Sequence, residues 1–306
     1  MCGIAGGVWR NKAEASRSIP LALKAMHQRG PDDKGFEVFT FGEISVCLGQ
    51  TRLSIIDLTS AGHQPMYSCD GRWVIIFNGE IYNYKELRNQ LKQLGYVFSS
   101  DSDTEVLLLA WVEWGIECLT RLVGMFAFAV LDKHSQNLTC VRDAFGIKPF
   151  FYSNADEGFR FASEIPALLS LLPGKPSLNM QRTYHYLVHG DYDSSADTFY
   201  QGVYHLPPAH WFTVDLRTGQ ASTPKQWWTP SVIERPGWRF DDAVEQVREQ
   251  FLTNIRLHLR SDVRVGAALS GGIDSSAIVC VMRYVEPDMP IHTFSYIAEG
   301  SSVNEE

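Results

Sequence analysis

The sequence predicts two domains of different class: an α+β domain with antiparallel sheets, followed by the beginning of an α/β domain with parallel strands. The first prediction follows from many short β segments punctuated by glycine, without regular alternation of strands and helices. The second follows from a β-α-β unit after residue 262, whose crossover we expect to be right-handed. A length of 306 residues suits two domains. We place the first domain at residues 2–217, a linker at 218–239 and the second domain at 240–306.

The bulk composition excludes several classes of protein. A net charge of −8 and a pI near 5.6 lack the basic footprint of a nucleic-acid-binding surface. The longest charge-free apolar run, Leu122–Leu131, is about half of a membrane span, and the N-terminus carries no signal-peptide pattern. The six cysteines show neither CxxC nor zinc-ligand spacing, so no metal ligands are assigned. We therefore expect a soluble, cytoplasmic protein without a nucleic-acid or membrane partner.

Strands and short helices are expected to alternate irregularly before residue 115. The segments are a glycine-rich strand over 3–9, a helix over 19–26, a hairpin of 36–41 and 44–48, a β-rich stretch over 51–56, a strand over 73–77, and helices over 84–94 and 106–114. The strand over 73–77 is apolar on both faces, which indicates that it is covered on both sides. Arg52 stands among apolar neighbours, either as a surface-edge residue or as a buried carboxylate clamp.

Two polar motifs in this region each allow two interpretations. Asn78-Gly79 is the commonest hairpin-turn dipeptide. It is alternatively a pair of donors, the Asn78 amide and the Gly79 N–H, at the end of a buried strand, which is what an oxyanion hole needs. Ser102-Asp103 precedes an apolar helix, and N-terminal capping is the simpler role for Asp103.

The remaining segments complete both domains. We expect strands over 124–131, 138–142, 150–152 and 158–162, helices over 165–172 and 240–259, a strand over 263–269, a helix over 277–285 and a strand over 290–297. The glycine-rich loop Ser270–Ser276 lies between a strand and a helix, so backbone N–H groups and a helix N-terminus surround one point. This is an anion site that matches neither the Walker A pattern nor GxGxxG; the alternative is a tight turn with glycines for geometry only.

The N-terminus holds a candidate nucleophile. If Met1 is removed, Cys2 carries a thiol and a free α-amine in one residue. Model α-amines titrate near ~7.7–8.0 and thiols near ~8.5, so the amine can take the thiol proton close to neutral pH. The alternative is a small, buried apolar cysteine without a chemical role.

Eight ordered blocks give the sequence a close resemblance to glutamine-hydrolysing asparagine synthetases, which belong to the class II glutamine amidotransferases. The blocks are Met1–Gly6, Arg29–Asp32, Arg52–Asp57, Gly62–Met66, Asn78–Asn83, Ser102–Glu105, Arg142–Pro149 and Ser270–Ser276. The resemblance implies that the first domain is an N-terminal-nucleophile glutaminase with an αββα sandwich. It also implies an ATP pyrophosphatase (PP-loop) synthetase domain after it.

The resemblance assigns roles in the first domain. Cys2 would attack the glutamine side-chain amide with its own α-amine as base, and Asn78 with the Gly79 N–H would hold the oxyanion. Arg52 would clamp the glutamine α-carboxylate, and Asp103 with the Glu80 region would receive the α-ammonium group. The backbone that follows Arg52 would line the glutamine site, namely Leu53, Ser54, Ile55 and Ile56.

The resemblance also assigns the second domain. ATP and Mg²⁺ would activate aspartate as an acyl-adenylate, and ammonia would convert it to asparagine, releasing AMP. The phosphates would contact Ser270, Gly271, Gly272, Asp274, Ser275 and Ser276, and the adenosine would lie near Ala268 and Tyr296. The family resemblance allows a homodimer. Gln50 stands where the family often has His, and we expect little consequence.

The chain stops at Glu306, soon after the second strand of the synthetase domain. We therefore expect a C-terminally truncated fragment that can hydrolyse glutamine but cannot make asparagine. Two alternatives stay open. One is an amidotransferase of the same family that uses another carboxylate acceptor, such as a surface-sugar or secondary-metabolite precursor; the other is a catalytically silent module.

Overall fold

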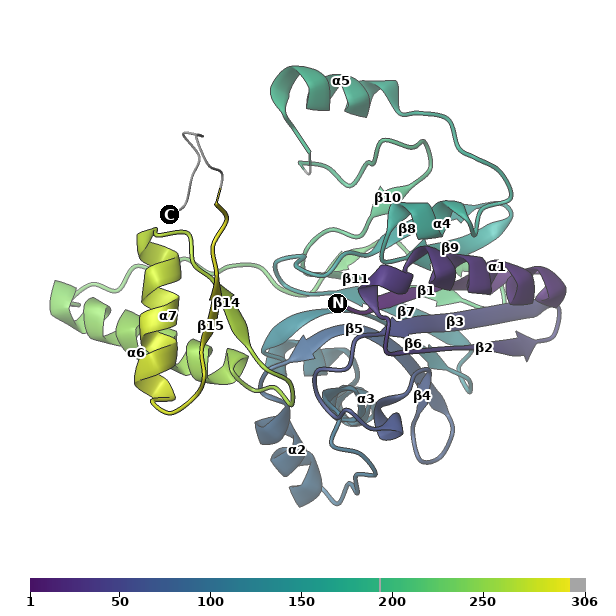
Figure 1. The fold of residues 1–306 in the computed structure, drawn as a ribbon. Coiled ribbons are helices and arrows are strands. Elements are labelled where there is room, and N and C mark those ends of the chain that lie inside the picture. Colours follow the sequence, from purple (N-terminus) through teal and green to yellow (C-terminus); the bar gives the residue numbers. More distant parts are fainter. Residues whose placement is uncertain (193, 298–306) are drawn as a thin grey trace. The chain divides into compact units, whose positions relative to one another are not determined.

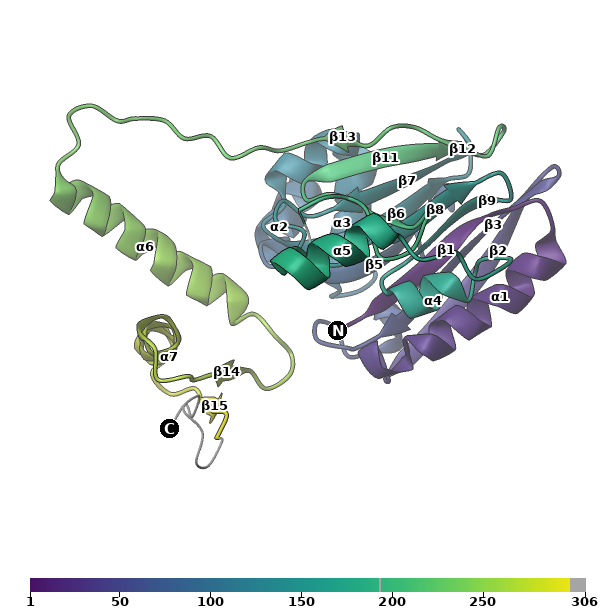
Figure 2. The same cartoon turned by 90° about the horizontal axis from the view of Figure 1, so that it is seen from above.

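Two antiparallel sheets lie at the centre of the first part of the chain (Figures 1 and 2). The structure is a computed structural model that describes residues 1–192 and 194–297. Its residues divide into two units, Met1–Pro230 and Ser231–Glu306. No helix among the described residues is long and apolar enough to cross a membrane.

The first sheet places the N-terminal strand in its middle. Its strands, in spatial order, are β10 (Tyr204–His205), β8 (Phe151–Ala155), β9 (Gly158–Ala162), β1 (Gly3–Trp9), β3 (Ile44–Arg52) and β2 (Asp33–Phe41). The glycines of β1 let its neighbours approach closely, since a Cβ on Gly6 would lie 2.5 Å from the Cys47 carbonyl oxygen. The expected hairpin around Gly42 is confirmed as β2 and β3.

The second sheet carries Asn78 and Gly79 inside a strand. Its order is β12 (Gln220–Ala221), β11 (His210–Asp215), β7 (Asn137–Arg142), β6 (Gly124–Asp132), β5 (Trp73–Ile81) and β4 (Met66–Tyr67), while β13 (Lys225–Gln226) also pairs with β11. Asn78 and Gly79 pair with Ala127 and Phe126 of β6. The hairpin-turn interpretation of Asn-Gly is therefore wrong. Residues 220–226, inside the expected linker, pair with β11 of this sheet.

Helices cover the outer face of each sheet (Figure 1). The first sheet carries α1 (Lys12–Ala25) and α4 (Ile165–Leu169), and the second carries α2 (Tyr84–Gln93) and α3 (Asp103–Trp114). Helix α1 begins seven residues earlier than expected because Asn11 caps it, accepting hydrogen bonds from the N–H groups of Ala13 and Glu14. The expected αββα sandwich is thus confirmed. Helix α5 (Met180–His189) stands away from both sheets in Figure 1.

Short 3₁₀ turns connect these elements. They are η1 (His27–Arg29), η2 (Ser60–Gly62) and η3 (Gly115–Arg121). The η1 and η2 turns flank the end of β3, where the chain turns out of the first sheet.

Aromatic side chains fill the space between the sheets. Phe150 and Phe161 are fully buried and stack with ring centroids 5.0 Å apart, and Phe212 packs edge-on against Phe150. Ala127 and Ala129 of β6 face this inner layer, while alternate residues of the same strand face α3. The second unit has its own elements: α6 (Phe240–His258), β14 (Gly266–Ala268), α7 (Ile273–Val285) and β15 (His292–Phe294).

The second unit pairs β14 with β15 in parallel, as the β-α-β prediction requires. Leu252, Ile255 and Met282 form the buried contact between α6 and α7. Val244 and Val247, which the helical spacing placed on the apolar face of α6, are exposed. The apolar face therefore extends beyond what α7 covers.

Replacing Phe150 by alanine tests the inner layer. Removing a fully buried, stacked ring leaves a cavity, so Phe150→Ala should lower the free energy of unfolding by about 3–5 kcal/mol. Phe145→Ala is the matched control, because Phe145 is exposed and should cost less than about 1 kcal/mol. Urea denaturation followed by tryptophan fluorescence measures both, since all tryptophans except Trp238 lie in the first unit. Equal losses for the two variants would contradict this account of the core.

Candidate active site

Cys2 precedes β1, where Gly3 pairs with Thr51 of β3. Its thiol faces the backbone of Leu53: the Leu53 N–H lies 3.4 Å from Sγ, and Sγ lies 3.6 Å from the Leu53 carbonyl oxygen. Burial raises the pKa of the Cys2 thiol, and the hydrogen bond from Leu53 opposes that shift. The thiol therefore stays protonated at neutral pH unless a base accepts its proton.

A pocket of about 240 Å³ opens beside this thiol. It brings together nine of the ten residues expected in the glutaminase site, which are Cys2, Arg52, Leu53, Ile55, Ile56, Asn78, Gly79, Glu80 and Asp103. Ser54 does not line it; the Ser54 N–H instead donates to Asp32 at 2.8 Å. The pocket lies where the end of β3, the middle of β5 and the start of α3 meet.

Arg52 is buried at the end of β3, so the surface-edge interpretation is wrong. Its guanidinium donates to the carbonyl oxygens of Thr59, Ile56 and Asp57. A guanidinium has five N–H donors, and these bonds use three of them. Within the described part of the chain the other two donors have no partner, so they are available to an anionic ligand.

Asn78 is fully buried in β5. The next residue, Gly79, has no room for a side chain. A Cβ on Gly79 would lie 2.2 Å from the carbonyl oxygen of Met125. Only glycine therefore lets β5 approach β6 at this point. The Asn78 side chain and the Gly79 backbone both line the pocket.

Asp103 is the first residue of α3, but it does not cap that helix. Ser102 is the N-cap, accepting from the Thr104 N–H at 3.1 Å, so the capping interpretation of Asp103 is wrong. The Asp103 carboxylate accepts from the Ile81 N–H at 3.0 Å. Burial raises the pKa of Asp103 to about 7, and the nearby Glu80 adds to the shift. Asp103 forms no ion pair with any of the residues that the structure describes, so its buried carboxylate is suited to receive a cationic group of a ligand.

Two glutamines that the sequence interpretation left without a role hold β5 at the pocket. The Gln50 side chain donates to the Phe77 carbonyl oxygen at 2.9 Å, and the Gln64 side chain accepts from the Phe77 N–H at 2.6 Å. Both are buried and both line the pocket. The expectation that Gln50 matters little is therefore incomplete, because this side chain bridges the two sheets next to Asn78.

Lys148 is a third unforeseen pocket residue. The Asp143 carboxylate accepts from the backbone N–H groups of Ile147 and Lys148 at 2.9 Å each, which fixes the loop. The Lys148 side chain is buried against the pocket, and burial lowers its pKa. The block Arg142–Pro149 was the signal that could have found it, since charged residues flank its glycine in an otherwise apolar region.

Arg29 also holds the N-terminal backbone at Cys2. Arg29 donates from Nε to the Cys2 carbonyl oxygen at 2.8 Å and forms an ion pair with Glu164 at 3.0 Å. Partial burial lowers the pKa of the Met1 α-amine. The Met1 α-amine is thus shifted toward its neutral, proton-accepting form.

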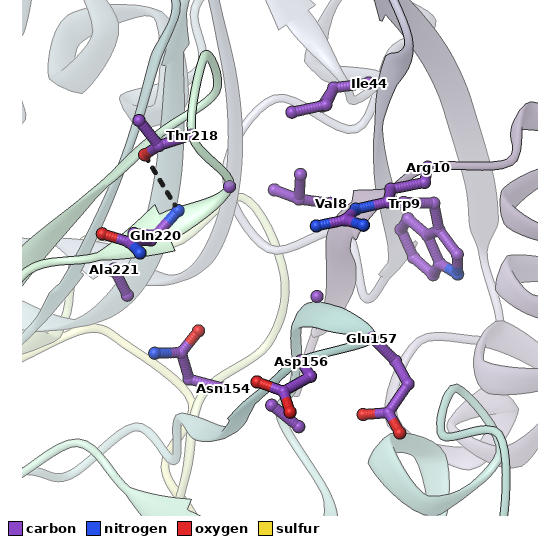
Figure 3. A pocket seen from close by; sticks show the side chains of 13 residues that line it. Val8, Trp9, Arg10, Ile44, Asn154, Asp156, Glu157, Thr218, Gln220 and Ala221 are labelled. Carbon is purple, nitrogen blue, oxygen red and sulfur yellow. Dashed lines mark hydrogen bonds between the residues drawn. The ribbon is translucent and has the colours of Figure 1, made fainter.

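Another pocket, of about 340 Å³, lies at the opposite end of β1 (Figure 3). Arg10, Asp156 and Glu157 give its wall charges of both signs, and Asn154 and Gln220 add neutral polar groups. Its lining residues include no cysteine or histidine. The chemical groups needed for nucleophilic catalysis therefore converge at the Cys2 end of the strand.

The glycine-rich loop of the second unit joins β14 to α7. Gly271 has φ of +74°, a conformation that favours glycine, and the Ser270 N–H donates to Ser275 Oγ at 3.2 Å. The structure brings Ser270, Gly271, Gly272 and Ser275 together at the start of α7. Ala268 ends β14, and Tyr296, beyond β15, is exposed.

The first unit has the αββα fold of the N-terminal-nucleophile hydrolases, with Cys2 placed before a central strand of one sheet. Residues 1–228 match the family described as "Glutamine amidotransferase domain", and the chain belongs to this family. Residues 246–305 match the family described as "Asparagine synthase".

The chain is similar to several curated proteins named as asparagine synthetases. It is 33% identical to a putative glutamine-hydrolysing asparagine synthetase 2 of Methanocaldococcus jannaschii, over 98% of this chain and 60% of that protein. It is 36% identical to asparagine synthetase 3 of Bacillus subtilis, over 96% of this chain and 48% of that protein. The chain thus spans about half the length of the curated relatives it matches.

Solved structures share the fold at low sequence identity. Glutamine phosphoribosylpyrophosphate amidotransferase from B. subtilis superposes with a TM-score of 0.51 at 17% identity, covering 98% of this chain and 67% of that chain. A structure described as the allosteric regulatory enzyme of purine biosynthesis gives a TM-score of 0.55 at 16% identity, with the same coverage. At such identities the likeness concerns the fold alone.

Replacing Asp103 by asparagine tests the buried charge. Because its pKa is about 7 when folded and near 3.8 when unfolded, this group favours folding at low pH and loses that contribution as pH rises from about 4 to 7. Asp103→Asn should therefore stabilise the protein at pH 8 by up to about 4 kcal/mol, three pKa units at ~1.4 kcal/mol each.

Thermal unfolding at pH 5 and pH 8 measures this effect. The gain should be larger at pH 8, because the carboxylate of the parent chain is ionised there. Asp101→Asn is the matched control, since the Asp101 side chain is almost fully exposed and should change stability by less than about 0.5 kcal/mol. An Asp103→Asn variant that is no more stable than the parent at pH 8 would contradict the raised pKa.

Proposed function

We propose that this chain hydrolyses glutamine at Cys2 and supplies ammonia for the synthesis of asparagine. The observation that carries the proposal is the pocket in which the Cys2 thiol meets Asn78, Gly79, Arg52 and Asp103. The pocket offers a nucleophile, neutral donors, a cation and a carboxylate. A glutamine has a group that matches each of them.

The reaction begins when Met1 is removed and Cys2 gains a free α-amine. The amine takes the thiol proton while Sγ bonds to the side-chain amide carbon of glutamine. Asn78 and the Gly79 N–H donate to the oxyanion that forms. Collapse of the intermediate breaks the C–N bond, and ammonia leaves with the proton that the amine held. Water then cleaves the thioester and releases glutamate.

Substrate recognition follows from charge and size. The two remaining donors of Arg52 take the α-carboxylate, and the carboxylates of Asp103 and Glu80 take the α-ammonium group. The backbone from Leu53 to Ile56 closes one side of the site, with Ser54 held against Asp32 rather than in the pocket. A pocket of about 240 Å³ suits one small amino acid.

The second unit would bind ATP at its glycine-rich loop. Backbone N–H groups at the start of α7 and the hydroxyls of Ser270, Ser275 and Ser276 are donors of the kind that phosphates require. Gly271, Gly272 and Asp274 complete this loop, and Ala268 and Tyr296 would lie toward the adenosine. When bound, ATP with Mg²⁺ would supply the activation of an aspartate carboxylate for attack by ammonia.

One relative carries a name other than asparagine synthetase. The chain is 31% identical, over 87% of its length, to a Gibberella zeae protein named amidase chry2. The alternative to asparagine synthesis is a member of the same family that amidates another carboxylate. In both cases all six cysteines are free among the described residues, which suits a cytoplasmic enzyme.

Covalent labelling of Cys2 tests the glutaminase proposal. Mass spectrometry of the purified chain should show loss of Met1, and the glutamine mimic 6-diazo-5-oxo-L-norleucine should label Cys2 alone. Cys2→Ala should abolish both labelling and glutamate release. Cys69→Ala is the matched control, because Cys69 is exposed and free but lies outside the pocket. Retention of Met1, or labelling of Cys69 in place of Cys2, would defeat the proposal.

Aspartate-dependent exchange tests the acceptor. In a protein that carries this chain with a full-length synthetase region, exchange of pyrophosphate into ATP should require aspartate, because adenylation precedes attack by ammonia. The expected dependence is at least tenfold over the rate without aspartate. Exchange that is indifferent to aspartate but responds to another carboxylate would favour the alternative acceptor.

A further inference from the structure

Ser163 is a buried hydroxyl at the meeting point of the two sheets. It follows directly after β9 and is fully buried. Its N–H donates to the Ile4 carbonyl oxygen at 2.8 Å, and its Oγ accepts from the Ile4 N–H at 2.9 Å. Ser163 therefore holds β1 two residues beyond Cys2 by both polar groups of Ile4.

The same hydroxyl faces Asn78 on the opposite sheet. Asn78 Nδ2 lies 3.5 Å from Ser163 Oγ, at the outer limit of a hydrogen bond. Asn78 Oδ1 is buried and has no hydrogen-bond partner among the described residues. A buried carbonyl oxygen without a donor is unfavourable, so this placement of the amide leaves one polar atom unsatisfied.

Rotating the Asn78 amide by 180° gives its oxygen a hydrogen-bond donor. The oxygen and nitrogen of an amide have nearly the same shape, so they exchange places without a steric change. The Ser163 hydroxyl accepts from Ile4 and still has its own O–H to donate. In the rotated amide, that O–H donates to Oδ1. Nδ2 then takes the buried position that Oδ1 had, where its N–H donors have no partner among the described residues and are left for a ligand. Asn78 lines the pocket and Ser163 does not.

We propose that Ser163 is a positioning residue, whose hydroxyl donates to Asn78 Oδ1 and so directs the Asn78 amide nitrogen toward the oxyanion. The inference rests on the proposed glutaminase function. It gives the hydroxyl one further task, because the same atom ties β1, which follows the nucleophile, to β5, which carries the oxyanion donor. The adjacent Glu164 acts on the same strand through Arg29 and the Cys2 carbonyl oxygen.

The kinetic test uses Ser163→Ala with glutamine as substrate. Without the hydroxyl, the Asn78 amide is free to present its oxygen to the pocket. The turnover number kcat should fall about tenfold, while KM for glutamine and the rate of Cys2 alkylation by iodoacetamide change less than about twofold, because an oxyanion donor acts in the transition state. Ser45→Ala is the matched control, since Ser45 is similarly buried at the far end of β3.

A double-mutant cycle separates orientation of Asn78 from support of β1. In the Asn78→Ala background, adding Ser163→Ala should lower kcat by less than about twofold, because no amide remains to be oriented. An equal loss in both backgrounds would overturn the proposal, and so would an unchanged kcat in Ser163→Ala alone. Where the alanine variant does not fold, Ser163→Cys keeps the volume with a weaker donor, and the same cycle applies.

The parent chain distinguishes the two levels of failure. A parent that releases no glutamate from glutamine defeats the proposed function and this inference with it. An active parent whose kcat is indifferent to Ser163 defeats only the inference and leaves Cys2 as the nucleophile.

Discussion

The contact between the two sheets at Phe77 is the constraint on which the site depends. Cys2 precedes β1 in one sheet, and Asn78 lies in β5 of the other, so their separation is set by how the sheets pack. Gln50 crosses from β3 to the Phe77 carbonyl oxygen, and Gln64 takes the Phe77 N–H. The two peptide groups that flank Phe77 are thereby held, and one of them adjoins Asn78. A shift of one sheet against the other would break buried hydrogen bonds, which is costly where no water can replace them.

The aromatic layer makes this contact rigid. Phe150, Phe161 and Phe212 fill the space between the sheets farther along the strands, and close-packed interiors resist sliding. Polar groups are concentrated instead at the pocket end of the strands. Burial there disfavours the charged forms of Asp103 and Lys148, since it raises the pKa of Asp103 and lowers the pKa of Lys148. A buried charged group reduces the stability of the fold, and a ligand group of opposite charge would offset that cost. The aromatic core therefore stabilises the fold, and the polar pocket is suited to recognise a ligand.

Local sequence patterns predicted most helices and strands. The residues whose roles were not predicted depend on contacts that are distant in the sequence. Alternation and apolar runs located β5, β6 and α3, because those patterns report burial directly. Asn78-Gly79 resembled a turn because a turn and a close approach between strands both demand glycine, and only the pairing with β6 distinguishes them. The glutaminase residues came from ordered motifs. Gln50 and Ser163 were missed because their roles depend on partners 27 and 85 residues away.

Burial at the start of β1 shifts the pKa of two neighbouring groups. It raises the pKa of the Cys2 thiol and lowers the pKa of the Met1 α-amine, so both groups favour their neutral forms. A neutral thiol is a poor target for oxidants, and a neutral amine is ready to accept a proton. Under the proposed mechanism, the thiolate and ammonium pair would form only when a substrate carbonyl and the donors of Asn78 and Gly79 can take up the negative charge. The desolvation of Cys2 would then couple its activation to the binding of glutamine.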